Sequence, residues 1–269
     1  MSYFLEKILE QKQKRVLARK QMFDKKELER LLASAIPVRE VYAELLRKEP
    51  NGIPIIAELK RRSPSKGEIC ASMSPGELAK RYEQGGARAV SVLCEEDYFG
   101  GSLEDLREAK RAVSSPVLCK DFIFCSFQVL EARIYGADMV LLIASGLNDE
   151  RLKELYVLIK EMGMAPLVEV HNQAELEKVL KLGARLIGIN NRNLHTLAVD
   201  LNTTRNLVPL IPKDRIVISE SGFSRREELE EMAGLGVKAF LIGHSILSSS
   251  APEDKLRELV YGQGQNLRD

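Results

Sequence analysis

The sequence contains no tryptophan and few of the residues that build metal sites or disulfide frameworks. The four cysteines are Cys70, Cys94, Cys119 and Cys125, and the three histidines are His171, His195 and His244. No two cysteines form a C-x-x-C pair, which argues against a zinc site. A chain of 269 residues can bury a core large enough to be stable without disulfides or structural metal.

The sequence also lacks an excess of charge of one sign and lacks a long apolar run. Forty Lys and Arg residues against 39 Asp and Glu residues leave a formal net charge of +1, so no whole-molecule field attracts nucleic acid or an anionic membrane. Residues 1–20 interleave charged and apolar side chains, unlike a signal peptide or a membrane span. We expect neither nucleic acid nor a membrane as a partner, and a reducing cytoplasm as the location.

Residues 1–50 predict a helical extension. Apolar side chains recur at near-helical spacing at Phe4, Leu5 and Ile8, and again through residues 28–32, between many charged residues. This spacing predicts two or three amphipathic helices. We expect a single domain over residues 1–269, with the main fold over residues 51–260 and a frayed tail over residues 261–269.

From residue 53 onward, short apolar runs alternate with charged helical stretches. Eight runs lie near residues 53–58, 89–94, 117–121, 138–143, 166–170, 186–190, 216–220 and 239–243. Helical stretches stop before a run at Gly86, Gly136, Gly183 and Gly236, as expected if left-handed glycines close them. Eight βα units predict an α/β fold, a (βα)8 TIM barrel. The competing doubly wound sheet would carry a G-x-G-x-x-G turn after its first strand, where residues 60–64 read KRRSP.

Polar residues close five of the apolar runs. They are Glu58 and Lys60, Lys120 and Asp121, Glu169, Asn190 to Arg192, and Glu220. Because chemistry in a barrel belongs at the carboxyl ends of its strands, we expect these side chains to meet at one mouth. Converging carboxylates and lysines shift one another's pKa values and can supply a proton donor and a proton acceptor near neutral pH. The pattern favours acid–base catalysis over a purely structural ring of ion pairs.

The last two runs are followed by glycines, in Ser221-Gly222 and in Gly243-His244. Barrels commonly bind phosphate at these two loops with the help of a short extra helix, which residues 244–248 could form. Residues 60–67 gather basic and hydroxyl side chains, and we expect Ser63 there to help grip an anion. Ordinary turn glycines and a solvated basic surface are the alternatives.

Other residues near the predicted mouth carry weaker signals. Phe122 could form an apolar wall for an aromatic ligand or fill the core. None of the three histidine side chains is assigned a role from this pattern, although His171 follows Glu169 by two positions.

Seven short motifs, in this order and spacing, closely resemble the indole-3-glycerol-phosphate synthase family of tryptophan biosynthesis. The motifs are IIAELK (55–60), SPSKG (63–67), KDF (120–122), LLI (141–143), LVEVH (167–171), IGINNR (187–192) and ESG (220–222). The resemblance covers nearly the whole chain and includes the helical extension that this family adds before its barrel.

The resemblance implies a carboxy-lyase that needs neither a metal nor another cofactor. Its reaction is ring closure of 1-(2-carboxyphenylamino)-1-deoxyribulose 5-phosphate to indole-3-glycerol phosphate, with loss of carbon dioxide and water. The implied catalytic residues are Lys120, Lys60, Glu169, Glu58, Asn190 and Glu220. We assign the condensation acid to Lys120 and the dehydration acid to Lys60, an order that spacing alone leaves open.

The same resemblance implies a set of residues that bind the substrate. They are Ser63, Phe122, Leu141, Arg192, Ser221, Gly222, Leu241, Gly243 and His244. Arg192 would pair with the anthranilate carboxylate, and the apolar members would contact the aromatic ring together with the N-terminal helices. His244 stands where a small or acidic residue is expected. The implied partner is this small molecule, and the chain is expected to be a monomer or a weak homodimer.

Two other functions compete with this one. Phosphoribosylanthranilate isomerase is a related barrel, but its first strand would end in cysteine, whereas this run ends in Glu58. A non-catalytic barrel that binds a sugar phosphate would have no reason to keep a costly cluster of buried charges.

Overall fold

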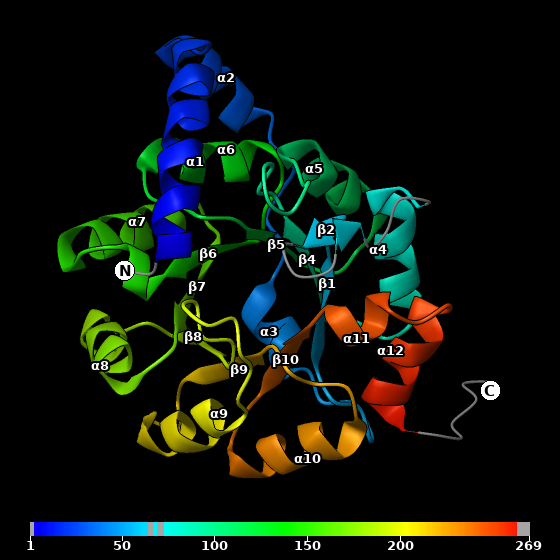
Figure 1. Cartoon of the computed structure of the whole chain (residues 1–269). Helices are drawn as coiled ribbons and strands as arrows, with labels where there is room; N and C mark the ends of the chain where they lie inside the picture. The colour runs from blue at the N-terminus through cyan, green and yellow to red at the C-terminus, as the bar shows by residue number, and fades with distance from the viewer. Residues whose placement is uncertain (1–2, 64–66, 69–72, 263–269) are drawn as a thin grey trace.

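The computed structural model describes residues 3–63, 67–68 and 73–262, and its centre is a closed parallel barrel (Figure 1). Eight strands of the described chain lie in the order β1-β10-β9-β8-β7-β6-β5-β4. They are β1 (Ile55–Leu59), β4 (Ala89–Leu93), β5 (Val117–Lys120), β6 (Met139–Ile143), β7 (Ala165–Val170), β8 (Leu186–Asn190), β9 (Ile216–Glu220) and β10 (Ala239–Ile242). Each predicted apolar run is a barrel strand, so the (βα)8 prediction is confirmed and the doubly wound sheet is excluded.

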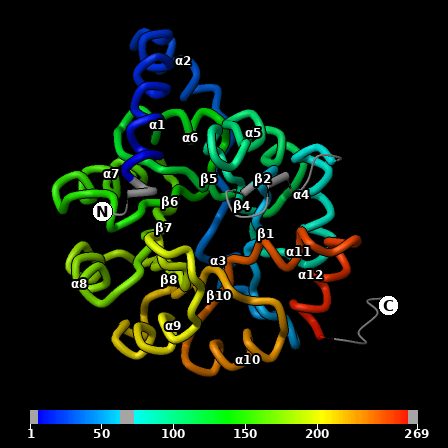
Figure 2. Tube along the Cα trace, viewed as in Figure 1, coloured from blue at the N-terminus to red at the C-terminus, as the bar shows by residue number. Residues whose placement is uncertain are grey.

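A ring of helices surrounds the barrel (Figure 2). They are α4 (Pro75–Gln84), α5 (Leu103–Ala112), α6 (Ser126–Ile134), α7 (Asp149–Glu161), α8 (Gln173–Leu182), α9 (Asn202–Leu207), α10 (Arg226–Leu235), α11 (His244–Leu247) and α12 (Pro252–Tyr261). Short 3-10 turns lie at η1 (Ala144–Gly146) and η2 (Val208–Leu210). The last helix, α12, packs against the first helix of the ring, α4, and so closes it.

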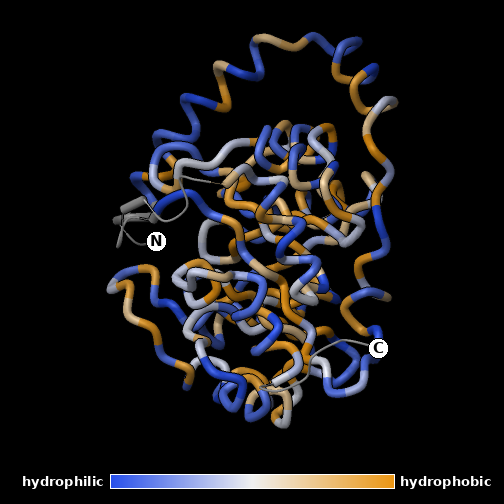
Figure 3. Tube along the Cα trace, turned by 90° about the vertical axis from the view of Figure 1, so that its right-hand side faces the viewer, coloured by the Kyte–Doolittle hydropathy of each residue, from blue (hydrophilic) through white to orange (hydrophobic). Residues whose placement is uncertain are grey.

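The strands and helices form where the sequence pattern places them. Strand side chains are buried on both faces of the sheet, inside the barrel or beneath the helices, while the outer helices alternate polar and apolar residues (Figure 3). The four predicted helix-stop glycines, Gly86, Gly136, Gly183 and Gly236, have φ values of 94°, 95°, 76° and 116°. These left-handed conformations favour glycine and end each helix where the next strand must begin.

The N-terminal extension consists of α1 (Tyr3–Gln21), α2 (Lys25–Ala33) and α3 (Val41–Leu46), as the periodicity predicted. Helix α1 lies beside α6 (Figure 1). The ammonium of Lys12, which is 1% exposed, lies 2.7 Å from Glu96 in the loop after β4 and 2.6 Å from Asp121 directly after β5. Arg19, which is partly exposed, pairs with Glu131 on α6 at 2.7 Å, so one buried and one partly exposed cation fix the position of α1.

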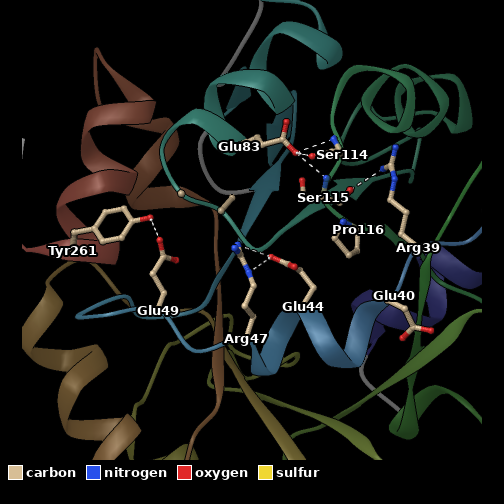
Figure 4. Close-up of a pocket in the computed structure, with 12 residues that line it drawn as sticks. Arg39, Glu40, Glu44, Arg47, Glu49, Glu83, Ser114, Ser115, Pro116 and Tyr261 are labelled. Carbon is tan, nitrogen blue, oxygen red and sulfur yellow. Dashed lines mark hydrogen bonds and ion pairs between the residues drawn. The ribbon is translucent and has the colours of Figure 1, made fainter. Parts of the chain in front are cut away.

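Helix α3 closes the opposite, amino end of the barrel. Val41 and Leu45 join the apolar cluster inside the barrel. Beside them lies a charged cavity of about 450 Å³ (Figure 4). The buried guanidinium of Arg88 pairs with Glu44 and Glu49 next to this cavity. These charges satisfy one another, which is typical of a barrel end that contributes to stability.

The C-terminal boundary differs from the prediction. Tyr261 was expected in the frayed tail, but it ends α12 and its hydroxyl donates a hydrogen bond of 2.9 Å to Glu49. The rest of that predicted tail, residues 263–269, lies outside the described residues.

The loop after β1 contains a small antiparallel pair, β2 (Arg62–Ser63) and β3 (Gly67–Glu68). Residues 64–66 between them lie outside the described residues. Arg61 pairs with Asp105 on α5 at 2.8 Å, and the Arg62 guanidinium donates to the backbone carbonyl of Asp97. Both arginines therefore anchor the loop to the loop after β4 and to α5.

The structure also shows the state of the cysteines and the character of the helices. Cys94, Cys119 and Cys125 are free thiols, and Cys70 lies outside the described residues. Among residues 3–63, 67–68 and 73–262, no helix is long and apolar enough to span a bilayer.

The buried pair of Lys110 and Asp138 gives a test of this packing. Both side chains are 0% exposed and their charged atoms lie 2.6 Å apart, and Asp138 also accepts hydrogen bonds from the backbone N–H groups of Val117 and Arg39. We predict that Asp138→Asn lowers the free energy of unfolding by about 3–5 kcal/mol, because it leaves a buried ammonium unpaired. Urea denaturation measures the loss.

The exposed pair of Arg205 and Glu231 provides the control for that measurement. Glu231→Gln should change the free energy of unfolding by less than about 1 kcal/mol. Equal changes in the free energy of unfolding for the two variants would contradict the expectation that burial makes the loss of an ion-pair partner costly.

Candidate active site

The predicted acid–base residues lie at the carboxyl ends of four barrel strands. Glu58 is in β1, Lys120 ends β5, Glu169 is in β7 and Glu220 ends β9. Because the strands are parallel and closed into a barrel, these ends meet at one mouth. The structure therefore brings together the charges that the sequence placed in widely separated stretches.

Lys120 occupies the centre of this cluster. Its Nζ lies 2.7 Å from Glu220 Oε2, and 3.8 Å from both Glu58 Oε2 and Glu169 Oε2. Burial alone would lower the pKa of Lys120, but the three carboxylates outweigh burial and raise the pKa above its usual value. The three carboxylates thus hold the group as an ammonium.

Glu58 joins the two lysines. Lys60 Nζ donates a hydrogen bond of 2.8 Å to Glu58 Oε1. Burial opposes ionisation of Glu58, but Lys60 and Lys120 together lower its pKa. The neighbouring Gly243 makes this arrangement possible, because a side-chain carbon there would lie 2.5 Å from Glu58 Oε1.

Glu169 and Glu220 differ in pKa although both are buried. Burial opposes the ionisation of Glu169, but His171 and Lys120 outweigh it and lower the pKa of this carboxyl to about 2. Burial and the negative charge of Glu169 raise the pKa of Glu220 to about 7, against the attraction of Lys120. Two carboxyls whose pKa values are pushed apart in this way are suited to different roles in proton transfer.

Glu220 packs where β8 leaves room for it. A side-chain carbon on Gly188 would lie 2.3 Å from Glu220 Oε1, so only glycine fits this position without moving the carboxyl. The sequence prediction did not include Gly188, although the I-G-I pattern of β8 marks a glycine inside a strand, which often indicates close approach of another group.

His171 is the second residue that the sequence prediction left without a role. Its Nε2 lies 3.2 Å from Glu169 Oε1, and its Nδ1 lies 3.1 Å from Glu175 Oε2. Burial would lower the pKa of His171, but the two carboxylates raise it to about 10.

Asn190 and Arg192 border the charged cluster on the side of β8. Asn190 helps to lower the pKa of Glu169, and its Oδ1 accepts a hydrogen bond of 3.0 Å from the Arg192 backbone. The Arg192 guanidinium donates to the carbonyl of Leu197 at 2.9 Å. Both residues line a cavity of about 610 Å³, together with His171 and Glu175.

The predicted phosphate residues lie on the adjoining side of the mouth. Ser221 and Gly222 have φ values of 68° and 98°, and a left-handed conformation is uncommon for serine. Gly243 directly precedes the short helix α11, which begins at His244, as predicted. Ser63 lies in β2, but its side chain is outside the described part of the chain.

The predicted apolar contacts lie at different depths. Leu141 and Leu241 are 2% and 3% exposed within the cluster that fills the barrel. Phe122 is only partly buried and packs against that cluster, with its ring 6.5 Å from the ring of Phe99. Phe122 is therefore the most exposed member of this set.

Comparison with known proteins agrees with this geometry. The model of the family described as indole-3-glycerol phosphate synthase matches residues 5–259. Among curated relatives of that name, the one from Aquifex aeolicus is 51% identical over 212 residues, covering 78% of this chain and 82% of the relative. The one from Aliarcobacter butzleri is 42% identical over 253 residues, covering 94% and 96% of the two chains.

Solved structures support the fold alone. An N-acetylmannosamine-6-phosphate 2-epimerase from Clostridium perfringens aligns with a TM-score of 0.59 at 18% identity, covering 78% of this chain and 93% of that one. A thiamine phosphate pyrophosphorylase from Pyrococcus furiosus aligns with a TM-score of 0.55 at 17% identity, covering 78% and 94%. With its fold, its strand-end charges and its close relatives in agreement, the chain belongs to the indole-3-glycerol phosphate synthase family.

Proposed function

We propose that this enzyme performs its family's decarboxylative ring closure by proton transfer among the lysines and glutamates at the barrel mouth. The observation that carries the proposal is the Lys120 ammonium, held among Glu58, Glu169 and Glu220. A cation in this position can protonate the substrate ketone while the anthranilate ring attacks it. We assign this condensation step to Lys120.

Loss of the ring hydroxyl after decarboxylation requires a second acid. We assign this step to Lys60, which directly follows β1 and whose ammonium donates a hydrogen bond to Glu58. Restoring aromaticity also requires a proton acceptor. A carboxyl with a pKa near 7 is suited to exchange protons at neutral pH, and Glu220 has such a pKa. The ionised carboxylates of Glu58 and Glu169 stabilise the lysine cations.

The remaining predicted residues would bind and orient the substrate. The phosphate would lie on Ser63 and on the backbone of Ser221, Gly222, Gly243 and His244. Asn190 would orient substrate hydroxyls, Arg192 would meet the anthranilate carboxylate, and Phe122, with Leu141 and Leu241 beneath it, would contact the ring. We also propose that the enzyme works in the cytoplasm as a monomer or weak homodimer, a location that fits its free thiols.

The role of Lys120 can be tested by removing its amine. We predict that Lys120→Ala lowers kcat by about 10²–10⁴-fold, because the proton donor is lost, while the circular dichroism spectrum stays native. Product is measured as the fluorescent indole. Lys153→Ala, on the exposed face of α7, is the control, and normal turnover by the Lys120 variant would remove this residue from the mechanism.

The close packing of Gly188 against Glu220 gives a second test. We predict that Gly188→Ala lowers kcat/KM by about a hundredfold, because the methyl group displaces the carboxyl by a distance on the order of 1 Å. Gly234→Ala is the matched control, since beyond its chain neighbours and its own helix backbone no atom lies within 4 Å of the added carbon. If the two variants retain equal activity, Glu220 does not need its present position.

The raised pKa of Glu220 predicts a pH dependence. Below pH 7 its carboxyl takes up a proton and loses its ionic contact with Lys120, so kcat should fall as the pH drops through about 7. In Glu220→Gln this inflection should be absent from the pH profile of kcat. An unchanged inflection in that variant would assign the titration to another group.

A further inference from the structure

His171 and Glu175 form a line of charged groups that leads from the active site to the start of α8. We propose that His171 is a positioning residue, which holds Glu169 ionised and directed toward Lys120, and that Glu175 in turn holds the His171 ring. The inference rests on the proposed function in one respect, because it assumes that turnover depends on Glu169.

The carboxylate of Glu169 lies between two cations. Its Oε1 is 3.2 Å from His171 Nε2, and its Oε2 is 3.8 Å from Lys120 Nζ. Glu169 is 2% exposed, so these contacts replace water around it. Its orientation is therefore set from both sides, and His171 supplies the side that faces away from Lys120.

The two contacts of His171 match a ring that carries a proton on each nitrogen. Nε2 faces Glu169 and Nδ1 faces Glu175, and an ionised carboxylate can only accept hydrogen bonds. A neutral ring would direct one lone pair at a carboxylate. The imidazolium is the form that matches both neighbours.

Glu175 is itself fixed by the beginning of α8. Its Oε2 accepts a hydrogen bond of 2.8 Å from the His171 backbone, and its Oε1 accepts one of 2.7 Å from the Asn172 side chain. The Asn172 side chain accepts in return from the Glu175 backbone at 3.0 Å. This N-cap holds the Glu175 carboxylate against the imidazole.

The surrounding elements contribute the other charged and polar groups. Glu169 also faces Lys120 from β5, Asn190 from β8 and Glu220 from β9. The cavity beside His171 is lined in addition by Arg192, His195 and Asp200. The two carboxylates are the groups that contact the imidazole ring directly.

This arrangement decides which carboxyl of the active site holds a proton. Because His171 keeps Glu169 negative, the neighbouring Glu220 is the one that takes up a proton near neutral pH. Without the imidazolium, the pair of Glu169 and Glu220 would lose a nearby positive charge and would bind its shared proton more tightly. Glu169 and Glu220 together would then keep one proton to a higher pH than in the wild-type enzyme, and Lys120 would be less well oriented.

The test compares the pH profiles of kcat and KM for His171→Gln, Glu175→Gln and the wild-type enzyme. His171→Gln keeps a hydrogen-bond donor but removes the charge. We expect it to move the acidic inflection of kcat upward by about one pH unit and to lower kcat at pH 7 by about tenfold. KM should change much less than kcat, and Glu175→Gln should shift the inflection in the same direction by a smaller amount.

Glu177→Gln is the matched control, because this exposed residue lies on the same helix and loses the same charge. A His171→Gln profile that coincides with the control profile would overturn the inference. Glu169→Gln separates this failure from failure of the proposed function. If Glu169→Gln is inactive while His171→Gln behaves like the control, only the inference about His171 fails. If Glu169→Gln is fully active, turnover does not depend on Glu169, and both the inference and the proposed function lose their premise.

Nuclear magnetic resonance of the wild-type imidazole groups tests the same inference without relying on a folded His171 variant. The His171 ring should remain protonated until the pH approaches about 10, and its titration should move to lower pH in Glu175→Gln. The signal is assigned by its absence from His171→Gln or, if that variant does not fold, by its contacts with the Glu175 side chain. Titration of His171 near its ordinary pKa of about 6.5 would overturn the inference.

Discussion

The ammonium group of Lys120 connects the carboxyl ends of four barrel strands, β1, β5, β7 and β9. Lys120 Nζ lies between 2.7 and 3.8 Å from three carboxylates on β1, β7 and β9. Without the lysine, these carboxylates would repel one another in a site with little water, and without them the lysine would lose its charge to burial. The cluster therefore exists only where parallel strands close into a barrel and bring their ends within ion-pair distance.

Much of the fold could be predicted because local signals and the global architecture agree. Short apolar runs, and glycines that are left-handed in the structure, marked where helices end and strands begin. The placement of the N-terminal extension could not be predicted in the same way. Lys12 and Arg88 look like surface charges in the sequence, yet they are 1% and 2% exposed, since their partners come from residues distant in the chain.

The active site shows the same division between local pattern and tertiary contact. Glu58, Lys120, Glu169 and Glu220 could be found because each closes an apolar run. His171 could not be assigned a role from the sequence, because its role depends on contacts with two carboxylates, one at each ring nitrogen. A partial signal was present: the asparagine and glutamate at positions 172 and 175 form a helix-capping pattern that turns the glutamate back toward the preceding residue.

The N-terminal extension is tied to the active site through the residue that follows Lys120. Asp121 is 4% exposed and pairs with Lys12 of α1 at 2.6 Å. Such a buried pair adds little net stability, but losing one partner is costly, so the pair mainly specifies where α1 must lie. The same contact fixes the direction in which the chain leaves β5. The end of the strand that supplies the central ammonium is therefore positioned from outside the barrel, while α3 closes the opposite end.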